Sequence, residues 1–407
     1  MRQDPGNIRI NDYSYDLPIN RIARYPLPER DLSRLLVWDG ATIKDHIFRE
    51  LPSLLRKNSL LVFNNTRVIR ARLLFTRDNG AKVEIFCLEP VTPHDFSQNL
   101  SSTSGVEWKC LIGNLKRWKT GWLSSDFEIG GKKYILNATR IAAEADTFVV
   151  RFEWNDLNVT FGEVLDALGH VPIPPYLCRE DEESDISRYQ TMYARIEGSV
   201  AAPTAGLHFT PRVIDDLDRA GIDRSEVTLH VSAGTFRPVK SEKISDHKMH
   251  TEHFFITHDT IQGLIERDII AVGTTTVRTL ESLYWLGAAI ADGRMSNVLI
   301  PSVSQWEPYD HDSKIDKDLA LECLIGWMRR VGMSEIEVKT DIIIVPGYRF
   351  RVINGMLTNF HQPGSTLLLL VAAFAGNSWR NIYRHALSSE YRFLSYGDSM
   401  LLLPHSG

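Results

Sequence analysis

Three histidines of this chain stand beside small residues or at strand ends, where a ligand can reach them. His208 lies in residues 199–210, a run built mostly of Ala, Gly, Ser, Thr and Pro that lets a ligand approach the backbone closely. His230 lies near the end of an alternating strand, on its polar face, just before a glycine turn. His361 follows Asn359 and Phe360 at the polar end of another predicted strand. We predict that these histidines belong to a pocket; a tightly packed loop with structural histidines is the alternative.

Residues 269–282 predict a strand, a turn at Gly273 and a helix that begins with three threonines. The free N–H groups at such a helix start suit a carboxylate or a phosphate. Arg278 and Glu281 lie three residues apart on one face of this helix. We take both as candidates for ligand contact, and an exposed ion pair is the alternative.

The sequence contains none of the common phosphate-binding, serine-hydrolase or zinc-protease motifs. His247, His250, Glu252 and His253 are side chains of the types that bind metals, and they occur within seven residues. Neither a helix nor a strand would place all four on one face. We therefore expect no metal site among them.

A basic, tryptophan-rich segment between residues 108 and 122 has the interleaved cations and aromatic rings that suit a nucleic-acid strand. Lys116, Arg117 and Lys119 are its candidates for RNA contact. The net charge of −5 argues against nucleic-acid binding over the whole surface. A solvated face of a β domain is the alternative for this segment.

Composition places the chain among ordinary globular proteins, with 43% hydrophobic and 24% charged residues in 407. The four cysteines are scattered without a CxxC pair, which suggests a reducing compartment. The longest apolar stretch, 366–375, is roughly half of a membrane span, and no signal pattern is visible at the start. We expect a cytoplasmic protein that does not enter a membrane.

Residues 68–154 read as five or six short strands, with a hairpin signal at Asn79-Gly80 and a strict alternation over 147–154. On either side, strands alternate with helices. We therefore predict an α/β (mixed α+β) chain. Residues 1–67 and 155–407 would form a helix-covered mixed sheet with the catalytic site, 68–154 an inserted small β-barrel, and 302–340 a peripheral insertion.

Several fragments together resemble the S-adenosylmethionine:tRNA ribosyltransferase-isomerase family of queuosine biosynthesis. They are RYPLPERDLSRLLV, LLVFNNTRVIRARL, RYQTMYAR, SVAAPTAGLHFT, VTLHVSAGTFRPV, HKMHTEHF, GTTTVRTLES, PGYRFRVINGMLTNFH, STLLLLVAAFAG and YRFLSYGDSMLL. The fragments span nearly the whole chain in the family's order. The chain departs from the family at Ser232, where Gly is usual, at Gly364, where Lys is frequent, and in the longer segment 302–340.

The resemblance implies that S-adenosylmethionine donates its ribosyl group to 7-aminomethyl-7-deazaguanine in the wobble position of a tRNA. Adenine and methionine leave, and epoxyqueuosine-tRNA forms. S-adenosylmethionine is then a consumed substrate, and no cofactor or metal is expected; we expect a monomer whose partners are tRNA and S-adenosylmethionine. Two alternatives stay open. A methyltransferase would use the same donor but needs a glycine-rich loop, and a non-catalytic RNA-binding protein would not need a histidine-containing pocket.

The resemblance also assigns roles to the candidate residues. His208 or His361 would be the base or acid, with His230 as a further candidate; Arg278 with the 274–276 turn would hold the methionine carboxylate, and Phe209 or Phe360 would stack on a ring. Asn64 and Arg67 would shape the RNA-facing rim. The predicted S-adenosylmethionine-binding residues are Thr204, Gly206, Phe209, Gly273, Thr274, Thr275, Arg278, Glu281, Asn359 and Phe360.

Overall fold

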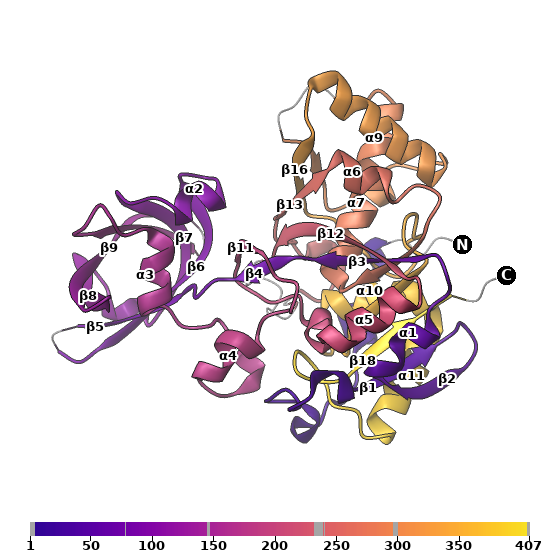
Figure 1. Ribbon diagram of the computed structural model, residues 1–407, viewed down its shortest axis with the longest axis horizontal. Coiled ribbons are helices and arrows are strands. Elements are labelled where there is room, and N and C mark those ends of the chain that lie inside the picture. The colour runs from indigo at the N-terminus through magenta and orange to yellow at the C-terminus, as the bar shows by residue number, and fades with distance from the viewer. Residues whose placement is uncertain are drawn as a thin grey trace.

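The chain folds into a large α/β body with a β-sheet insertion that projects to one side (Figure 1). The computed structural model describes residues 5–77, 79–144, 147–231, 239, 241–295 and 300–404. A short parallel ribbon of β4 (Thr66–Val68) and β11 (Ile196–Ser199) lies between the two parts. No helix in these ranges is long and apolar enough to cross a membrane.

The larger body is built on one mixed sheet of ten described strands. In spatial order they are β15 (Ser302–Val303), β16 (Glu335–Thr340), β13 (Glu252–Thr257), β12 (Asp223–His230), β3 (Ser59–Asn64), β14 (Asp268–Val272), β17 (Gly355–Asn359), β18 (Ser399–Leu402), β1 (Arg34–Trp38) and β2 (Ile43–Ile47). The central strands β12, β3, β14 and β17 run parallel to one another. Every residue of β3 is buried, as expected of a strand covered on both faces.

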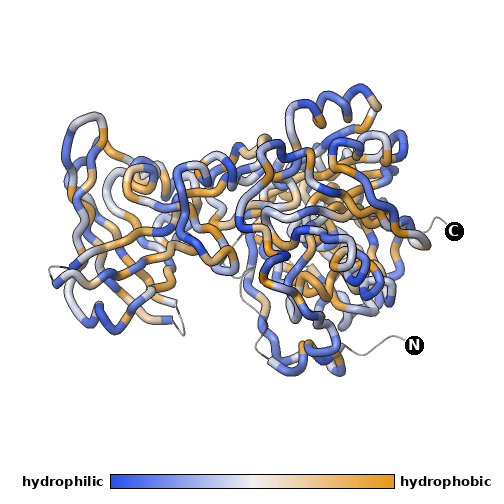
Figure 2. Tube along the Cα trace, turned by 90° about the horizontal axis from the view of Figure 1, so that it is seen from below, coloured by the Kyte–Doolittle hydropathy of each residue, from blue (hydrophilic) through white to orange (hydrophobic). Residues whose placement is uncertain are grey.

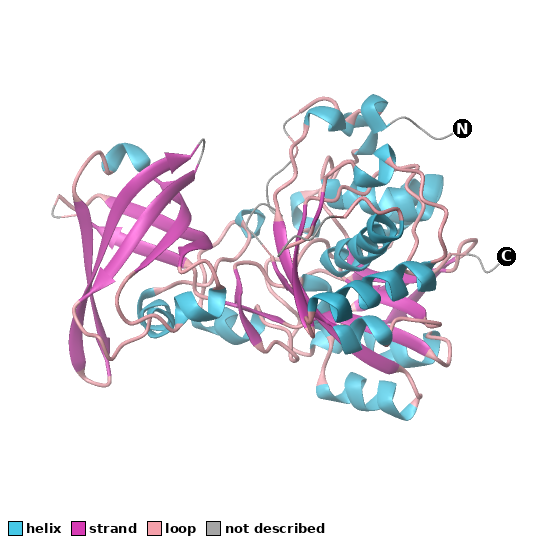
Figure 3. Cartoon of the chain, turned by 90° about the horizontal axis from the view of Figure 1, so that it is seen from above, coloured by secondary structure: helices cyan, strands magenta, loops and turns pink. Residues whose placement is uncertain are grey.

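Helices lie on both faces of this sheet (Figure 3). Alternate residues of the central strands enter different cores: Leu60 and Val62 pack with the helices of one face, and Leu61 and Phe63 with those of the other. The first face carries α6 (His258–Gln262), α7 (Thr274–Ala291), α9 (Lys317–Val331), α10 (Thr366–Ala375) and α11 (Trp379–Ser388). The second carries α1 (Leu51–Leu54) and α5 (Pro211–Arg219). Two short helices, α4 (Glu183–Arg188) and α8 (Glu307–Asp310), complete the body.

The insertion is a six-stranded antiparallel sheet that curls until its first strand lies beside its last. Its order is β5 (Arg72–Thr76), β6 (Lys82–Thr92), β7 (Val106–Gly113), β10 (Thr147–Trp154), β9 (Lys132–Glu144) and β8 (Trp122–Ile129). The helices α2 (Phe96–Leu100) and α3 (Phe161–Leu168) pack against it. The predicted fold class, a helix-covered mixed sheet with a small inserted barrel, is therefore confirmed.

Segment 302–340 lies at one edge of the large sheet, where β15 and β16 extend it and α9 packs on α7. Leu321 and Leu324 of α9 are fully buried in the main core. The segment is thus peripheral in position but continuous with both the sheet and its core. Figure 2 shows how hydropathy follows this architecture: hydrophobic residues lie inside the larger body, and hydrophilic residues lie along its surface loops.

Two interpretations that the local sequence favours, a hairpin at Asn354-Gly355 and a strand over 342–345, are wrong. Asn354 and Gly355 do not form a hairpin, because Asn354 instead exchanges hydrogen bonds with Ile269 and leads β17 into parallel pairing with β14. The apolar run Ile342–Val345 is buried but pairs with none of the described strands. Both errors come from partners distant in the sequence, which override local turn and strand preferences.

Candidate functional site

A pocket opens at the carboxyl ends of the parallel strands β12, β14 and β17. Its lining includes Val231, which follows β12, Gly273 to Thr275, which follow β14, and residues 358–362 at the end of β17. The small residues 201–205 form another wall. This is the edge at which open α/β sheets bind ligands, because strands end there and helices begin.

The amino end of α7 forms one wall of the pocket. Gly273 takes φ +95°, a conformation that favours glycine, and its N–H donates to the carbonyl of Leu357 at 2.8 Å. Among the described residues, no side chain caps this 18-residue helix. Its first-turn N–H groups, beside Thr274 and Thr275 in the lining, are therefore suited to bind an anionic group of a ligand.

Asn359 connects the pocket to His208, which lies behind the lining. The Oγ1 of Thr204 donates to the Oδ1 of Asn359 at 2.9 Å, and the Asn359 amide nitrogen lies 3.3 Å from the Nε2 of His208. The Nδ1 of His208 lies 2.9 Å from the Oγ of Ser33. Both ring nitrogens are thus engaged, and burial lowers the pKa of His208 to about 3, which keeps the ring neutral. His208 thus contacts Asn359 but does not itself line the pocket.

His361, by contrast, lines the pocket. Its Nε2 lies 2.9 Å from the Oγ1 of Thr358, and its backbone N–H donates to the hydroxyl of Tyr383 at 3.0 Å. Within the described part of the chain its Nδ1 has no hydrogen-bond partner. Burial lowers the pKa of His361 to about 3, so the imidazole is neutral at pH 7. Of the three predicted histidines, only His361 combines a neutral ring, a pocket position and an unengaged nitrogen.

His230 lies outside the pocket, although Val231 next to it lines the wall. Its ring stacks on Phe96 of the insertion with 4.2 Å between ring centres. Its Nδ1 is buried without a partner in the described residues, and burial lowers its pKa to about 4. The turn expected after it, which includes Ser232, lies outside the described residues.

Arg278 and Glu281 lie on α7 but point away from the pocket. Arg278 forms a buried ion pair with Glu252, and its Nε donates to the carbonyl of Ile342 at 3.0 Å. Glu281 is fully buried and accepts hydrogen bonds from the hydroxyl of Tyr348 and three backbone N–H groups of residues 351–353. Arg278 and Glu281 therefore neither contact the pocket nor form an exposed ion pair with each other, because both side chains are buried in the core.

Three other predicted site residues also lie in the core. Gly206 lets Tyr193 approach so closely that a Cβ would lie 1.8 Å from its hydroxyl. Phe209 packs edge-on against Phe48 and Phe63 and does not line the pocket. Phe360 does line it, but its ring is also packed among Tyr383, Tyr391 and Phe393.

The proposed RNA-facing residues divide into buried and exposed ones. Asn64 is fully buried and joins β3 to β12 by donating to and accepting from the backbone of Leu229, so its predicted place on a rim was wrong. Arg67 is exposed and lies 3.6 Å from Glu197. Lys116, Arg117 and Lys119 are exposed on the insertion.

The tryptophans near these cations are mostly not available for stacking on bases. Trp108 and Trp118 are fully buried in the barrel core, whereas Trp122 is 70% exposed. Strand alternation explains only the buried Trp108 beside Lys109 on β7, whereas Lys116, Arg117, Trp118 and Lys119 lie in and just after a short 3-10 turn between β7 and β8.

The sequence reasoning missed several lining residues. Tyr176 and Ser395 form a hydrogen bond of 2.5 Å at the pocket wall, and Thr358 and Gln362 flank the trio that it did identify. Ser395 falls in the fragment YRFLSYGDSMLL, so the resemblance could have indicated it. Gly364, a position that departs from the family, takes φ +65° close to the pocket.

Comparison with known proteins places this architecture in a family. The profile of the queuosine biosynthesis protein family matches residues 10–402. The S-adenosylmethionine:tRNA ribosyltransferase-isomerase of Treponema denticola is 40% identical over 96% of this chain and 99% of its own length. That of Syntrophomonas wolfei is also 40% identical, over 97% of each chain. A solved S-adenosylmethionine tRNA ribosyltransferase from Thermotoga maritima covers 96% of this chain at 28% identity, with a TM-score of 0.45. The chain belongs to the queuosine biosynthesis protein family.

Proposed function

We propose that this chain is an S-adenosylmethionine:tRNA ribosyltransferase-isomerase. It would transfer and isomerise the ribosyl group of S-adenosylmethionine onto 7-aminomethyl-7-deazaguanine in the wobble position of a tRNA. The products would be epoxyqueuosine-tRNA, adenine and methionine. The structural observation that carries the proposal is the pocket in which 201–205, 273–275 and 358–362 meet, since it joins an anion site to a neutral histidine.

In this pocket the methionine carboxylate would bind the first-turn N–H groups of α7, where the helix dipole favours negative charge. The small residues Ala201, Ala202 and Ala205 leave room for the nucleoside beside the backbone. The amide of Asn359, held by Thr204 and His208, would supply a fixed polar contact to the ribose or the base. In this proposal the carboxylate is bound by backbone N–H groups at the start of α7 and not by Arg278. Arg278 instead stabilises the fold through its buried pair with Glu252.

His361 would exchange the protons of the reaction. The sulfonium acidifies the neighbouring ribose C5′ hydrogens, and a neutral imidazole can accept one of them. With its Nε2–H donated to Thr358, His361 would present the Nδ1 lone pair to the pocket. The imidazolium formed in that step would then pass its proton on to the departing adenine. The sulfonium is itself the leaving group, so the chemistry as proposed needs no cofactor.

The insertion would help to hold the tRNA, since Lys116, Arg117 and Lys119 present exposed positive charge on it. We propose that the enzyme acts as a monomer in the cytoplasm, where its tRNA substrate is found.

Product analysis tests the proposal. Purified protein given S-adenosylmethionine and tRNA carrying the deazaguanine should release adenine and methionine in equal amounts, with or without a chelator. S-adenosylhomocysteine would instead indicate methyl transfer, and binding of tRNA without any product would indicate a non-catalytic RNA-binding protein. Loss of all turnover on chelation would contradict the cofactor-free chemistry.

A further inference from the structure

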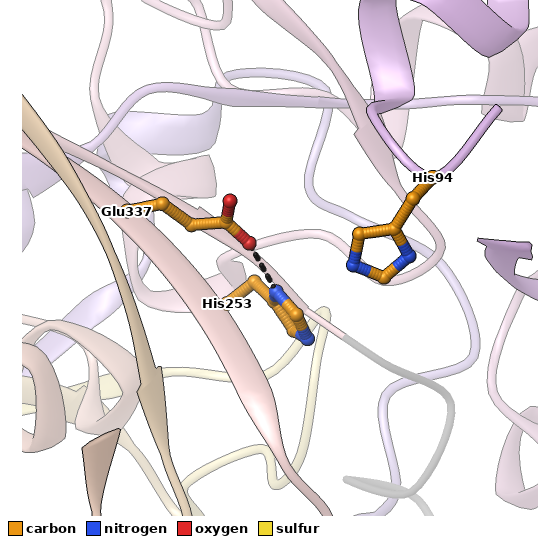
Figure 4. Close-up of side chains that lie close together, drawn as sticks. All are labelled: His94, His253 and Glu337. Carbon is orange, nitrogen blue, oxygen red and sulfur yellow. Dashed lines mark hydrogen bonds and ion pairs between the residues drawn. The ribbon is translucent and has the colours of Figure 1, made fainter. Parts of the chain in front are cut away.

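Three side chains with metal-binding atoms meet at the junction between the insertion and the large sheet (Figure 4). His94 comes from the loop between β6 and α2, His253 from β13 and Glu337 from the neighbouring β16. One ligand atom from each lies within 4.8 Å of the others, and the Nδ1 of His253 is 2.7 Å from the Oε1 of Glu337. None of the three lines the pocket described above.

The donor set is that of a zinc site. Two imidazoles and one carboxylate, completed by water, give the four-coordinate arrangement that Zn²⁺ adopts, whereas Mg²⁺ and Ca²⁺ prefer oxygen ligands. At zinc bond lengths of about 2.0–2.1 Å the ligand atoms would stand roughly 3.4 Å apart. His94 is exposed, so rotation of its side chain would shorten the present separation of the ligand atoms, which is up to 4.8 Å, to the separation in a zinc site.

The surroundings show what a bound ion would do. Two residues after His94, the first residue of α2, Phe96, stacks its ring on His230, and His230 is paired directly with His253 across β12 and β13. A Cβ on Gly198 would lie 2.7 Å from both His230 and Phe96, so these groups are closely packed. The segment that leads from β6 into α2 therefore contacts two adjacent strands of the large sheet: the His94 ring lies against His253 of β13, and the Phe96 ring lies against His230 of β12.

We propose that His94, His253 and Glu337 bind one Zn²⁺ ion, which ties the insertion to the large sheet. The ion holds the insertion in a fixed orientation next to Val231, the pocket residue that follows His230. It is a structural clamp, separate from the proposed ribosyl transfer. It also differs from the set His247, His250, Glu252 and His253 considered in the sequence, because only His253 contributes and Glu252 is committed to Arg278.

Zinc titration of the full chain against a chromophoric chelator tests the proposal. A Cys178→Ser background removes the exposed thiol, which would also bind zinc. This protein should bind one equivalent of Zn²⁺, with no competition from excess Mg²⁺, and its melting temperature should rise with zinc concentration. His94→Ala, a change at the surface, should weaken zinc binding by more than ~10-fold. Loss of a residue that only hydrogen-bonds to a metal ligand already lowers metal affinity by about 10-fold or more, and His94 is a ligand itself. Glu337→Gln should do the same.

His46→Ala is the matched control, since the Nδ1 of His46 also lies 2.7 Å from a glutamate, Glu50, and no third metal-binding side chain joins this pair among the residues that the structure describes. It should leave zinc binding unchanged. Circular dichroism of His94→Ala without zinc should match that of the parent, which separates lost binding from lost folding. Absence of a stoichiometric zinc site in the parent, or equal affinity in His94→Ala and the parent, would overturn the proposal whether or not the enzyme transfers ribosyl groups.

Discussion

The buried pair of Arg278 and Glu252 provides a test between two roles for the arginine. Both side chains are less than a tenth exposed, and they join α7 to β13 beneath the pocket. If Arg278 held the methionine carboxylate, its loss would weaken substrate binding with little effect on folding. If it is a core ion pair, its loss leaves the Glu252 carboxylate buried without its counter-ion.

The expected loss of stability follows from the second role, that of a core ion pair. Removing one partner of a buried ion pair destabilises a protein by about 3–5 kcal/mol. Roughly 320 residues lie outside the insertion, and at about 2.1 cal/mol/K of unfolding entropy per residue a loss of ~4 kcal/mol lowers the melting temperature by about 6 °C. We therefore expect Arg278→Met to lower the melting temperature by this amount. The double variant Arg278→Met/Glu252→Leu should recover most of it, since apolar replacement of a whole buried pair is often neutral or stabilising.

Thermal unfolding of the single and double variants, with the KM for S-adenosylmethionine measured on each, is the assay. Arg219→Met is the control, because Arg219 pairs with Asp216 at the surface and such pairs contribute about 1 kcal/mol or less. An Arg278→Met protein that melts like the parent but has a KM raised tenfold or more would refute the reasoning and restore the carboxylate role.

The remaining predictions concern the histidines and the basic surface. His361→Ala should lower kcat by at least ~10²-fold, as expected for an acid–base group. His208→Ala should mainly raise KM, with recovery in His208→Gln; a kcat loss in His208→Ala that exceeds that in His361→Ala would reverse the assignment. Because the pKa values of His208 and His361 fall from 6.5 to about 3 on folding, the unfolded state takes up their protons first as pH falls, and stability is lost from pH 6.5 down to pH 3. His230, whose pKa falls to about 4, adds a third such group, so urea unfolding should show a loss of roughly 3.5 kcal/mol between pH 6 and pH 5, reduced by about a third in His208→Gln. Replacing Lys116, Arg117 and Lys119 with Ala should weaken tRNA binding and reduce the slope of log affinity against log salt by roughly one per lost phosphate contact; an unchanged slope would place the RNA elsewhere.

Local sequence patterns determined much of the fold. The alternation over 147–154 predicted β10 because a strand with one buried face repeats every two residues. Thr210 and Ser365 are residue types that favour helix starts, and each accepts a hydrogen bond from the first turn of its helix, α5 or α10. The order of the motifs along the chain determined the family. These signals are local, or are read in sequence order, so they do not depend on which segments meet in space.

Tertiary structure alone decided which side chains face the pocket. A helical period places Arg278 and Glu281 on one face but does not say that Glu252 and Tyr348, far away in the sequence, bury them. Strand alternation likewise does not show that the side-chain amide of Asn64 forms two hydrogen bonds with the backbone of Leu229. The cluster of His94, His253 and Glu337 brings together the insertion and two strands of the large sheet. The cost of burying an unpaired polar group decides such pairings, and it depends on neighbours that only the folded chain brings together.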